Sequence, residues 1–198
     1  MKQLTFKQYR QIDLTIFCLL TAVFEAIATY SSNYWLVFQA MTISITLTMT
    51  CITMVRWSSY AIAPALIGSF VYCLVSKATP KQFLIYCGGS IFCLLSLLVL
   101  KHLKKERVRT SFAVRLAFIL TTYLCVALGR WVCSLPFEFS FNTILAFIFT
   151  DVLSLLFAIL ILTLAKNADG LIEDQKSYLL RLEKERLEEQ EENASHPF

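Results

Sequence analysis

Six apolar stretches, each about as long as a membrane-crossing helix, occupy most of this 198-residue chain. A helix needs roughly 20 apolar residues to cross the hydrocarbon core of a bilayer. A composition with 57% hydrophobic and only 16% charged residues, and a mean hydropathy of +0.63, agrees with a multi-span membrane protein. We therefore expect an all-α, six-transmembrane-helix bundle over residues 1–166 and a cytoplasmic acidic amphipathic helix and tail over 167–198. The stretches lie at about 13–31, 34–55, 60–76, 82–100, 112–133 and 142–165.

The segment MTISITLTMTCITM at 41–54 alternates apolar and hydroxyl residues, a pattern typical of a half-buried strand. A strand in lipid would leave its backbone N–H and C=O groups unpaired, and stretches such as LLSLLVL do not alternate as the strands of a closed barrel would. We therefore expect a helix whose hydroxyls fall on two seams. Either this helix packs tightly in the interior, or one seam lines a polar cavity.

Basic residues are distributed unevenly between the predicted loops. With the N-terminus inside, the outer loops hold only Lys77 and Lys81. Positively charged loops stay on the cytoplasmic side, so we expect both termini to be cytoplasmic. The basic run KHLKKERVR at 101–109 could recognise anionic lipid, although topology alone explains it. The inner segments hold Lys2, Lys7, Arg10, Arg56, Lys101, Lys104, Lys105, Arg107, Arg109 and Lys166.

The N-terminal segment allows two interpretations. A basic start, an apolar run over 14–24 and the pair Ala26 and Ala28 imitate a cleaved signal peptide. Glu25, immediately before the possible cleavage site, and the charge distribution both favour a helix that is retained.

The C-terminal segment differs in charge from the rest of the chain. Nine of the 14 acidic residues lie at or beyond Asp169, and the preceding part holds 14 basic and five acidic residues, a net charge of +9. An apolar stripe that includes Tyr178, Leu179 and Leu182 is too short for a self-sufficient coiled coil. We expect a cytoplasmic helix that packs near the inner membrane face or binds a partner through these three residues.

Motifs of enzyme chemistry are missing from the sequence. The seven cysteines all fall in apolar stretches and form no C-x-x-C pair, so we expect them to act as small hydrophobic residues. The two histidines, His102 and His196, lie outside the spans, and no H-E-x-x-H, G-x-S-x-G or P-loop occurs. We expect no enzyme, no cofactor, no metal site and no nucleic-acid partner.

Three ionisable residues lie deep in the predicted spans. Glu25, Arg130 and Asp151 all fall in the outer half of the membrane, where each charge costs roughly 2.5–3.5 kcal/mol on insertion scales. Either they form a structural ion pair between the first, fifth and sixth spans, or they line a pocket that binds a polar ligand. Arg115 lies near the inner boundary, where its long side chain can reach the headgroups.

Aromatic residues gather around the predicted outer loops. Tyr34 and Trp35 flank the first outer loop, and Trp131 flanks the third. They form either an interfacial aromatic belt or the stacking walls of a ligand site that opens to the outside.

A known family shares several of these features. Six short spans in under 200 residues, the pattern Ala22-x-x-x-Ala26 with Ala28, a hydroxyl-rich second span and the segment VRWSSYAIAPALIGSFVYCL resemble the substrate-binding S component of an energy-coupling factor (ECF) vitamin transporter. The segment GLIEDQKSYLLRL is similar to small membrane proteins of Gram-positive bacteria related to that group. The resemblance covers residues 1–182.

The resemblance implies a protein of the bacterial cell membrane that captures a vitamin-like molecule from outside. It also implies that Ala22, Ala26 and the neighbouring Ala28 pack against a transmembrane T subunit driven by two ATPases. Glu25, Arg130, Asp151 and the outer aromatic residues would suit a flat, ring-bearing ligand such as a folate, flavin or corrinoid. The acidic tail departs from typical S components.

Two other classes of protein remain open. A small membrane anchor or assembly factor would dock a partner through its C-terminal helix and use the three buried charges as structural pairs. An intramembrane enzyme acting on membrane lipids would need an acid–base constellation, which the sequence does not show.

Overall fold

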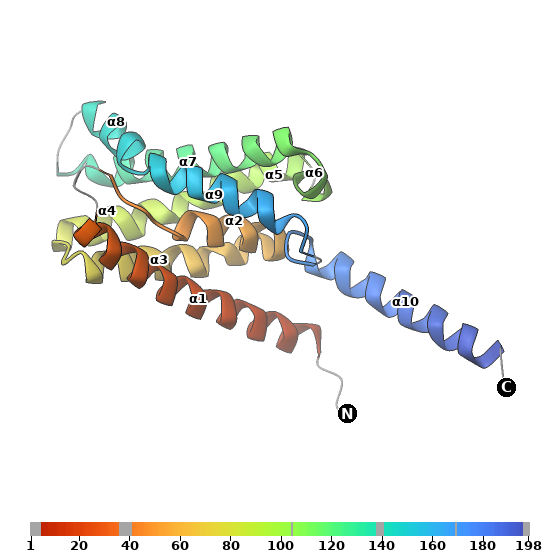
Figure 1. Cartoon of the computed structure of the whole chain (residues 1–198). Coiled ribbons are helices and arrows are strands. Elements are labelled where there is room, and N and C mark those ends of the chain that lie inside the picture. The colour runs from red at the N-terminus through yellow and green to blue at the C-terminus, as the bar shows by residue number, and fades with distance from the viewer. Residues whose placement is uncertain (1–4, 36–40, 104, 138–140, 169, 196–198) are drawn as a thin grey trace.

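The chain folds as a bundle of helices with one helix extending from its end (Figure 1). The computed structural model describes residues 5–35, 41–103, 105–137, 141–168 and 170–195, with side chains apart from 33–35, 141, 189 and 190–195. All regular elements in these ranges are helical, as expected. They are α1 Phe6–Trp35, α2 Thr46–Trp57, η1 Ser58–Ala61, α3 Ile62–Val75, α4 Pro80–Ile91, η2 Phe92–Leu95, α5 Ser96–Leu103, α6 Lys105–Thr110, α7 Phe112–Ser134, α8 Phe141–Thr150, α9 Val152–Ala165 and α10 Gln175–Ser195.

Helix α2 forms the centre of the bundle, between α1, α3, α7 and α9 (Figure 1). Cys51, Met54 and Val55 are fully buried in the main apolar core, and the hydroxyl residues Thr48 and Thr53 are buried as well. Small hydroxyl side chains allow the surrounding helices to approach closely. The predicted interior helix is therefore confirmed for Thr46–Trp57.

The helix predicted over 34–55 is wrong in its first part. Helix α1 continues to Trp35, residues 41–45 are not helical, and α2 begins only at Thr46. The strand-like alternation at 41–54 therefore covers two different structures. Its first residues form a non-helical segment, and the rest forms a buried helix.

The chain reverses direction between α2 and α3. In a straight helix, Thr46 and Gly68 would be about 33 Å apart. Instead they are in contact, and a Cβ atom added to Gly68 would lie 2.7 Å from Thr46 Cγ2. The reversal takes place at η1, where Ser58 has a φ of 54°.

The number of candidate membrane spans depends on how this hairpin is counted. By length and composition, four described segments qualify, namely Phe6–Ser32, Thr46–Val75, Pro80–Leu103 and Phe112–Ser134. The pair Asn142–Thr150 and Val152–Ala165, bent by 43°, makes a fifth. A helical multi-span membrane protein is thus confirmed, with four to five candidate spans. The count of six, which treats α2 and α3 as separate crossings, stays a prediction.

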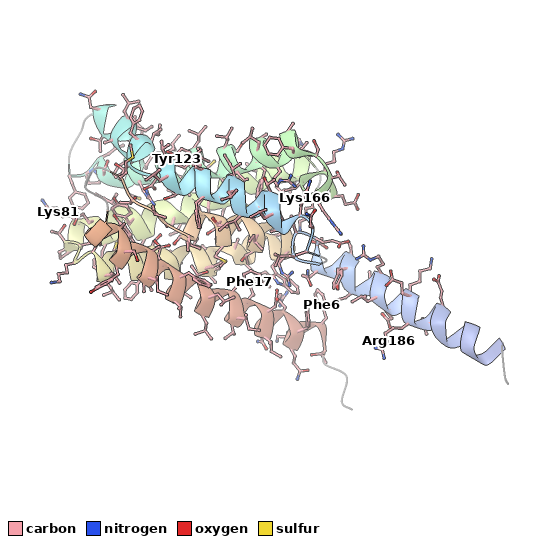
Figure 2. All side chains as sticks on the ribbon, in the orientation of Figure 1. Phe6, Phe17, Lys81, Tyr123, Lys166 and Arg186 are labelled. Carbon is pink, nitrogen blue, oxygen red and sulfur yellow. The ribbon has the colours of Figure 1, made fainter. Side chains whose placement is uncertain are left out.

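The two ends of the bundle carry different residues. Lys81 lies at one end, and Phe6 and Lys166 lie at the opposite end, from which α10 extends (Figure 2). We call these the Lys81 end and the α10 end. Tyr123 lies between them, nearer Lys81 (Figure 2).

A buried ion pair ties α10 to the bundle. Arg56 is 7% exposed and donates to both carboxylate oxygens of Asp13, at 2.7 and 3.0 Å. The same guanidinium donates to the carbonyl of Gly170, which also accepts a 2.7 Å hydrogen bond from Gln175 at the start of α10. Tyr9 donates to Gln175 at 3.1 Å. The first, second and last helices are therefore joined at one cluster of polar groups.

Substitution of Gly68 by alanine tests the hairpin. In an exposed position of a straight helix, this change stabilises by about 1 kcal/mol. Against Thr46 the new methyl group overpacks the α2–α3 contact, and we expect a loss of about 1–3 kcal/mol in unfolding free energy. Gly88→Ala is the matched control, because its methyl group would meet the Cys133 side chain alone, with Sγ at 3.0 Å and Cβ at 3.9 Å. Denaturation in detergent measures both variants, and a stabilised Gly68→Ala would contradict the hairpin.

Candidate functional site

The first backbone N–H groups of α2 have no acceptors in a preceding helical turn, because residues 41–45 are not helical. Glu25 supplies the acceptor instead. The Oε2 atom of this α1 side chain accepts from the backbone N–H groups of Ile45 and Thr46, at 2.8 and 3.0 Å. It also accepts from the hydroxyls of Ser44 and Thr46, at 3.0 and 2.9 Å. A carboxylate at a helix N-terminus is favoured by both the free N–H groups and the helix dipole. Glu25 therefore caps a neighbouring helix.

The last apolar stretch is interrupted at Asp151, between α8 and α9. The carbonyls at the end of α8 receive donors from elsewhere in the chain. The Tyr123 hydroxyl donates to the carbonyl of Ile148, and the N–H of Thr42 donates to the carbonyl of Thr150 at 2.9 Å. Helix breaks at membrane depth are tolerated where the protein itself satisfies the freed backbone groups.

The non-helical segment 41–45 and the break at Asp151 lie against each other. The N–H of Ser44 donates to the Ser154 hydroxyl at 2.9 Å, and that hydroxyl donates to the Thr42 carbonyl at 3.1 Å. The Thr42 hydroxyl donates to Asp151 Oδ1 at 2.8 Å. Residues more than 100 positions apart in the sequence are thus joined through their irregular backbone.

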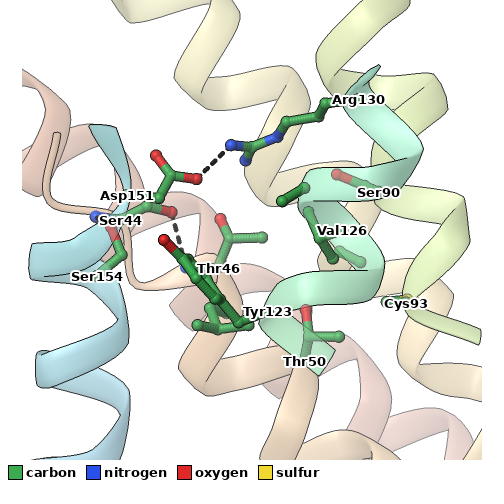
Figure 3. Close-up of a pocket in the computed structure, with 13 residues that line it drawn as sticks. Ser44, Thr46, Thr50, Ser90, Cys93, Tyr123, Val126, Arg130, Asp151 and Ser154 are labelled. Atoms are coloured by element: carbon green, nitrogen blue, oxygen red, sulfur yellow. Dashed lines mark hydrogen bonds and ion pairs between the residues drawn. The ribbon is translucent and has the colours of Figure 1, made fainter. Parts of the chain in front are cut away.

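Arg130 of α7 pairs with Asp151 at this junction (Figure 3). Its guanidinium also lies 4.5 Å from the centre of the Tyr86 ring, within cation–π range. The position of Arg130 depends on close contact between α4 and α7. A Cβ atom on Gly89 would lie 2.7 Å from the Arg130 backbone nitrogen, so only glycine permits this crossing.

A small cavity of about 30 Å³, with polar and apolar residues in its wall, lies beside this pair (Figure 3). Its volume suits one or two water molecules. Among the described residues, three buried polar atoms in or next to its wall have no hydrogen-bond partner, namely Glu25 Oε1, Thr50 Oγ1 and Arg130 Nε. Four further such atoms lie elsewhere in the described part of the chain, on Thr29, Thr48, Arg115 and Thr163, so the three atoms here support a polar site only together with the cavity beside them. Residues lining the cavity include Ser44, Thr46, Thr50, Tyr123, Arg130, Asp151 and Ser154.

The predicted site residues have different positions. Arg130 and Asp151 form the predicted ion pair, but Glu25 is not part of it, because its bonded oxygen is occupied by the start of α2. Trp131 follows Arg130 on α7 and is half-buried. The side chains of Tyr34 and Trp35 lie outside the described part of the chain.

Several participating residues were not predicted. Thr42, Ser44 and Ser154 join the segment 41–45 to the break at Asp151. Thr42 and Ser44 belong to the hydroxyl alternation at 41–54, which predicted helical seams instead, and Ser154 carries no local signal. Tyr123 and Tyr86 lie in ordinary apolar spans and carry no local signal.

The expected headgroup contact of Arg115 is wrong. This side chain is 2% exposed and donates to the carbonyls of Val108 and Arg109, at 3.3 and 3.2 Å. It therefore bonds the end of α6 within the protein. The ion pair of Asp13 and Arg56 was also missed, because both residues lie at the edges of their predicted spans.

The residues predicted to bind partners are half-buried. Ala22, Ala26 and Ala28 flank the buried stripe of α1. In α10, the Tyr178 ring packs against Gly170, and Leu179 and Leu182 are partly covered.

Within the described ranges, no three His, Cys, Asp or Glu side chains gather as ligands of a metal ion would. No family model, curated protein or solved structure matches the chain significantly.

Removal of the Glu25 carboxylate tests its role at the start of α2. Glu25→Ala leaves the N–H of Ile45 and the hydroxyls of Ser44 and Thr46 in this half-buried segment without their acceptor, whereas the N–H of Thr46 keeps only the Ser44 hydroxyl at 3.2 Å. We therefore expect a loss of about 2 kcal/mol in unfolding free energy. Glu25→Gln keeps one acceptor oxygen and should lose less. The exposed Glu106→Ala is the control and should change stability by no more than about 0.5 kcal/mol. Equal stability of Glu25→Ala and the unmodified protein in detergent denaturation would exclude the cap.

Proposed function

We propose that this protein is the membrane-embedded solute-binding subunit of an ATP-driven importer of the ECF type. It captures a vitamin- or cofactor-like small molecule from the outer side. The observation that carries the proposal is the helix break at Asp151, which pairs with Arg130 and lies against the non-helical segment 41–45 before α2. Membrane transporters build solute sites from interrupted helices of this kind, because the freed backbone groups and buried charges bind polar ligands. The resemblance to S components is independent support.

The proposal includes a topology of six crossings. Residues 41–45 with α2 form the second crossing, and α3 returns through the membrane as the third. The α10 end, which carries most of the loop arginines and lysines, is cytoplasmic, and the Lys81 end faces outward. Both termini are then cytoplasmic, and the Arg130 site lies in the outer half of a bacterial cell membrane.

Ligand binding at this site requires the bundle to open. A vitamin-sized molecule occupies a site of about 300–1,000 Å³, whereas the present cavity has about 30 Å³. The bend at Asp151 is the natural place for such a movement, because α8 can swing away while α9 stays in the core. Separation of Asp151 from Arg130 then exposes one group of each charge to the ligand.

Delivery of the solute needs partner proteins, since the chain itself performs no catalysis. A T subunit docks along α1, where Ala22, Ala26 and Ala28 allow close helix contact. Two ATPases on the cytoplasmic side supply the energy.

One observation favours a second candidate function. Helix α10 is 21 residues long and extends beyond the bundle, with exposed Leu180 and Leu187 among acidic side chains (Figure 1). A membrane anchor that docks a cytoplasmic partner on α10 would use the Arg130–Asp151 pair only for structure.

Purification of the full-length chain from the membranes of its own host separates the two functions. The importer subunit should copurify with one T subunit and two ATPases and should retain a small molecule detectable by mass spectrometry. Recovery of a partner without ATPase activity, together with no retained molecule, would instead identify an anchor.

A double substitution separates binding from folding at the Arg130–Asp151 pair. Removal of one partner alone, as in Arg130→Met, leaves a buried charge and should cost about 3–5 kcal/mol. The double variant Arg130→Met/Asp151→Leu removes both charges, and we expect it to fold about as stably as the unmodified protein. If the pair binds the ligand, the folded double variant loses the copurified molecule. Lys81→Gln, at the outer end but outside the site, is the control and should retain it. Undiminished retention in the double variant would exclude these residues from the binding site.

A further inference from the structure

A second, larger cavity lies at the α10 end, away from the Arg130 site. It has about 320 Å³ and is bordered by the turn after α2 and by the end of α5. Its six lining residues combine three kinds of chemistry. Leu97 and Leu100 are apolar, Ser58 and Ser59 carry hydroxyls, and Lys101 and Lys105 are cationic.

The polar part of this cavity fits a phosphate group. Lys101 is exposed, and Lys105 reaches the same space while it pairs with Asp174. An ammonium group has three donors, so Lys105 can bind Asp174 and an anion together. The hydroxyls of Ser58 and Ser59 supply two more possible donors on the other side.

The apolar part distinguishes a lipid from a free anion. Leu97 and Leu100 lie on the last two turns of the apolar segment Pro80–Leu103, immediately before the basic residues. This is the depth at which phospholipid headgroups meet their acyl chains. Leu97 and Leu100 offer a free phosphate ion no favourable contact. The first carbons of an acyl chain would cover these two side chains and remove their apolar surface from water.

We propose that this cavity binds the headgroup of an anionic phospholipid. The phosphate lies between Lys101, Lys105 and the two serine hydroxyls, and the first acyl carbons lie against Leu97 and Leu100. Basic pockets between membrane helices recognise anionic lipids in this way. The site is independent of the solute site, and it requires only that the bundle spans a membrane.

Lipid retention tests the assignment. The full chain is reconstituted in phosphatidylcholine nanodiscs with a minor fraction of phosphatidylglycerol, transferred into mild detergent and analysed by native mass spectrometry. We expect phosphatidylglycerol to be enriched over its share in the nanodisc. Lys101→Gln removes one lysine contact, and we expect it to retain phosphatidylglycerol about fivefold more weakly than the unmodified protein. Lys166→Gln is the matched control, because Lys166 is an exposed lysine at the same end but does not line the cavity.

Three results would overturn the proposal. No enrichment of phosphatidylglycerol in the unmodified protein would exclude a selective site. An equal decrease in Lys101→Gln and Lys166→Gln would mean that only the general charge of this surface attracts the lipid. Displacement of the lipid by millimolar inorganic phosphate would identify a site for the free anion. Because Lys101 is exposed, Lys101→Gln should fold normally. The enrichment of phosphatidylglycerol is measured on the unmodified protein and does not depend on any variant.

Discussion

The carboxylate of Glu25, bonded to the start of α2, is the contact on which the arrangement of the bundle depends. Backbone groups in hydrocarbon need partners within the protein, and a helix that begins in mid-membrane has free N–H groups at its first turn. Because the Glu25 carboxylate accepts the N–H groups of Ile45 and Thr46, the segment 41–45 before them can stay non-helical. This segment bonds to the helix break at Asp151, and Asp151 pairs with Arg130.

The two arginine ion pairs have different surroundings. Arg56 is surrounded by acceptors, namely Asp13 and the carbonyl of Gly170, and this cluster joins the helices at the α10 end. Arg130 keeps a buried Nε atom with no hydrogen-bond partner among the described residues, next to a cavity. A satisfied cluster stabilises one arrangement, whereas an incompletely satisfied one can exchange its partners for a ligand. This difference is why our proposal gives binding to the Arg130–Asp151 pair and structure to the Arg56–Asp13 pair.

The sequence predicted those parts of the fold that depend on hydropathy alone. The helix expected at 112–133 is observed as Phe112–Ser134, because a long and predominantly apolar segment in a membrane must pair its backbone groups within itself. The free-energy cost of a charge within a membrane span likewise identified Arg130 and Asp151 as residues that need a partner. The start of α2 was not predictable, because TLTMT in the helix (46–50) and MTISI before it (41–45) show the same alternation of apolar and hydroxyl residues. Their difference comes from Glu25, 20 residues earlier. The contacts of Arg115 and Tyr123 depend on helix packing, which no local pattern encodes.

Amide hydrogen exchange of residues 42–46 in lipid nanodiscs tests the central claim most directly. The N–H groups of Thr42, Ser44, Ile45 and Thr46 lie outside regular helix, or at its first turn, and donate to side chains and backbone of other helices. We predict slow exchange in the unmodified protein and much faster exchange of this segment in Glu25→Ala, while the middle of α7 stays protected. Unchanged protection of the segment in Glu25→Ala would show that it is held by its own helical hydrogen bonds, and would contradict the interrupted span and the site built on it.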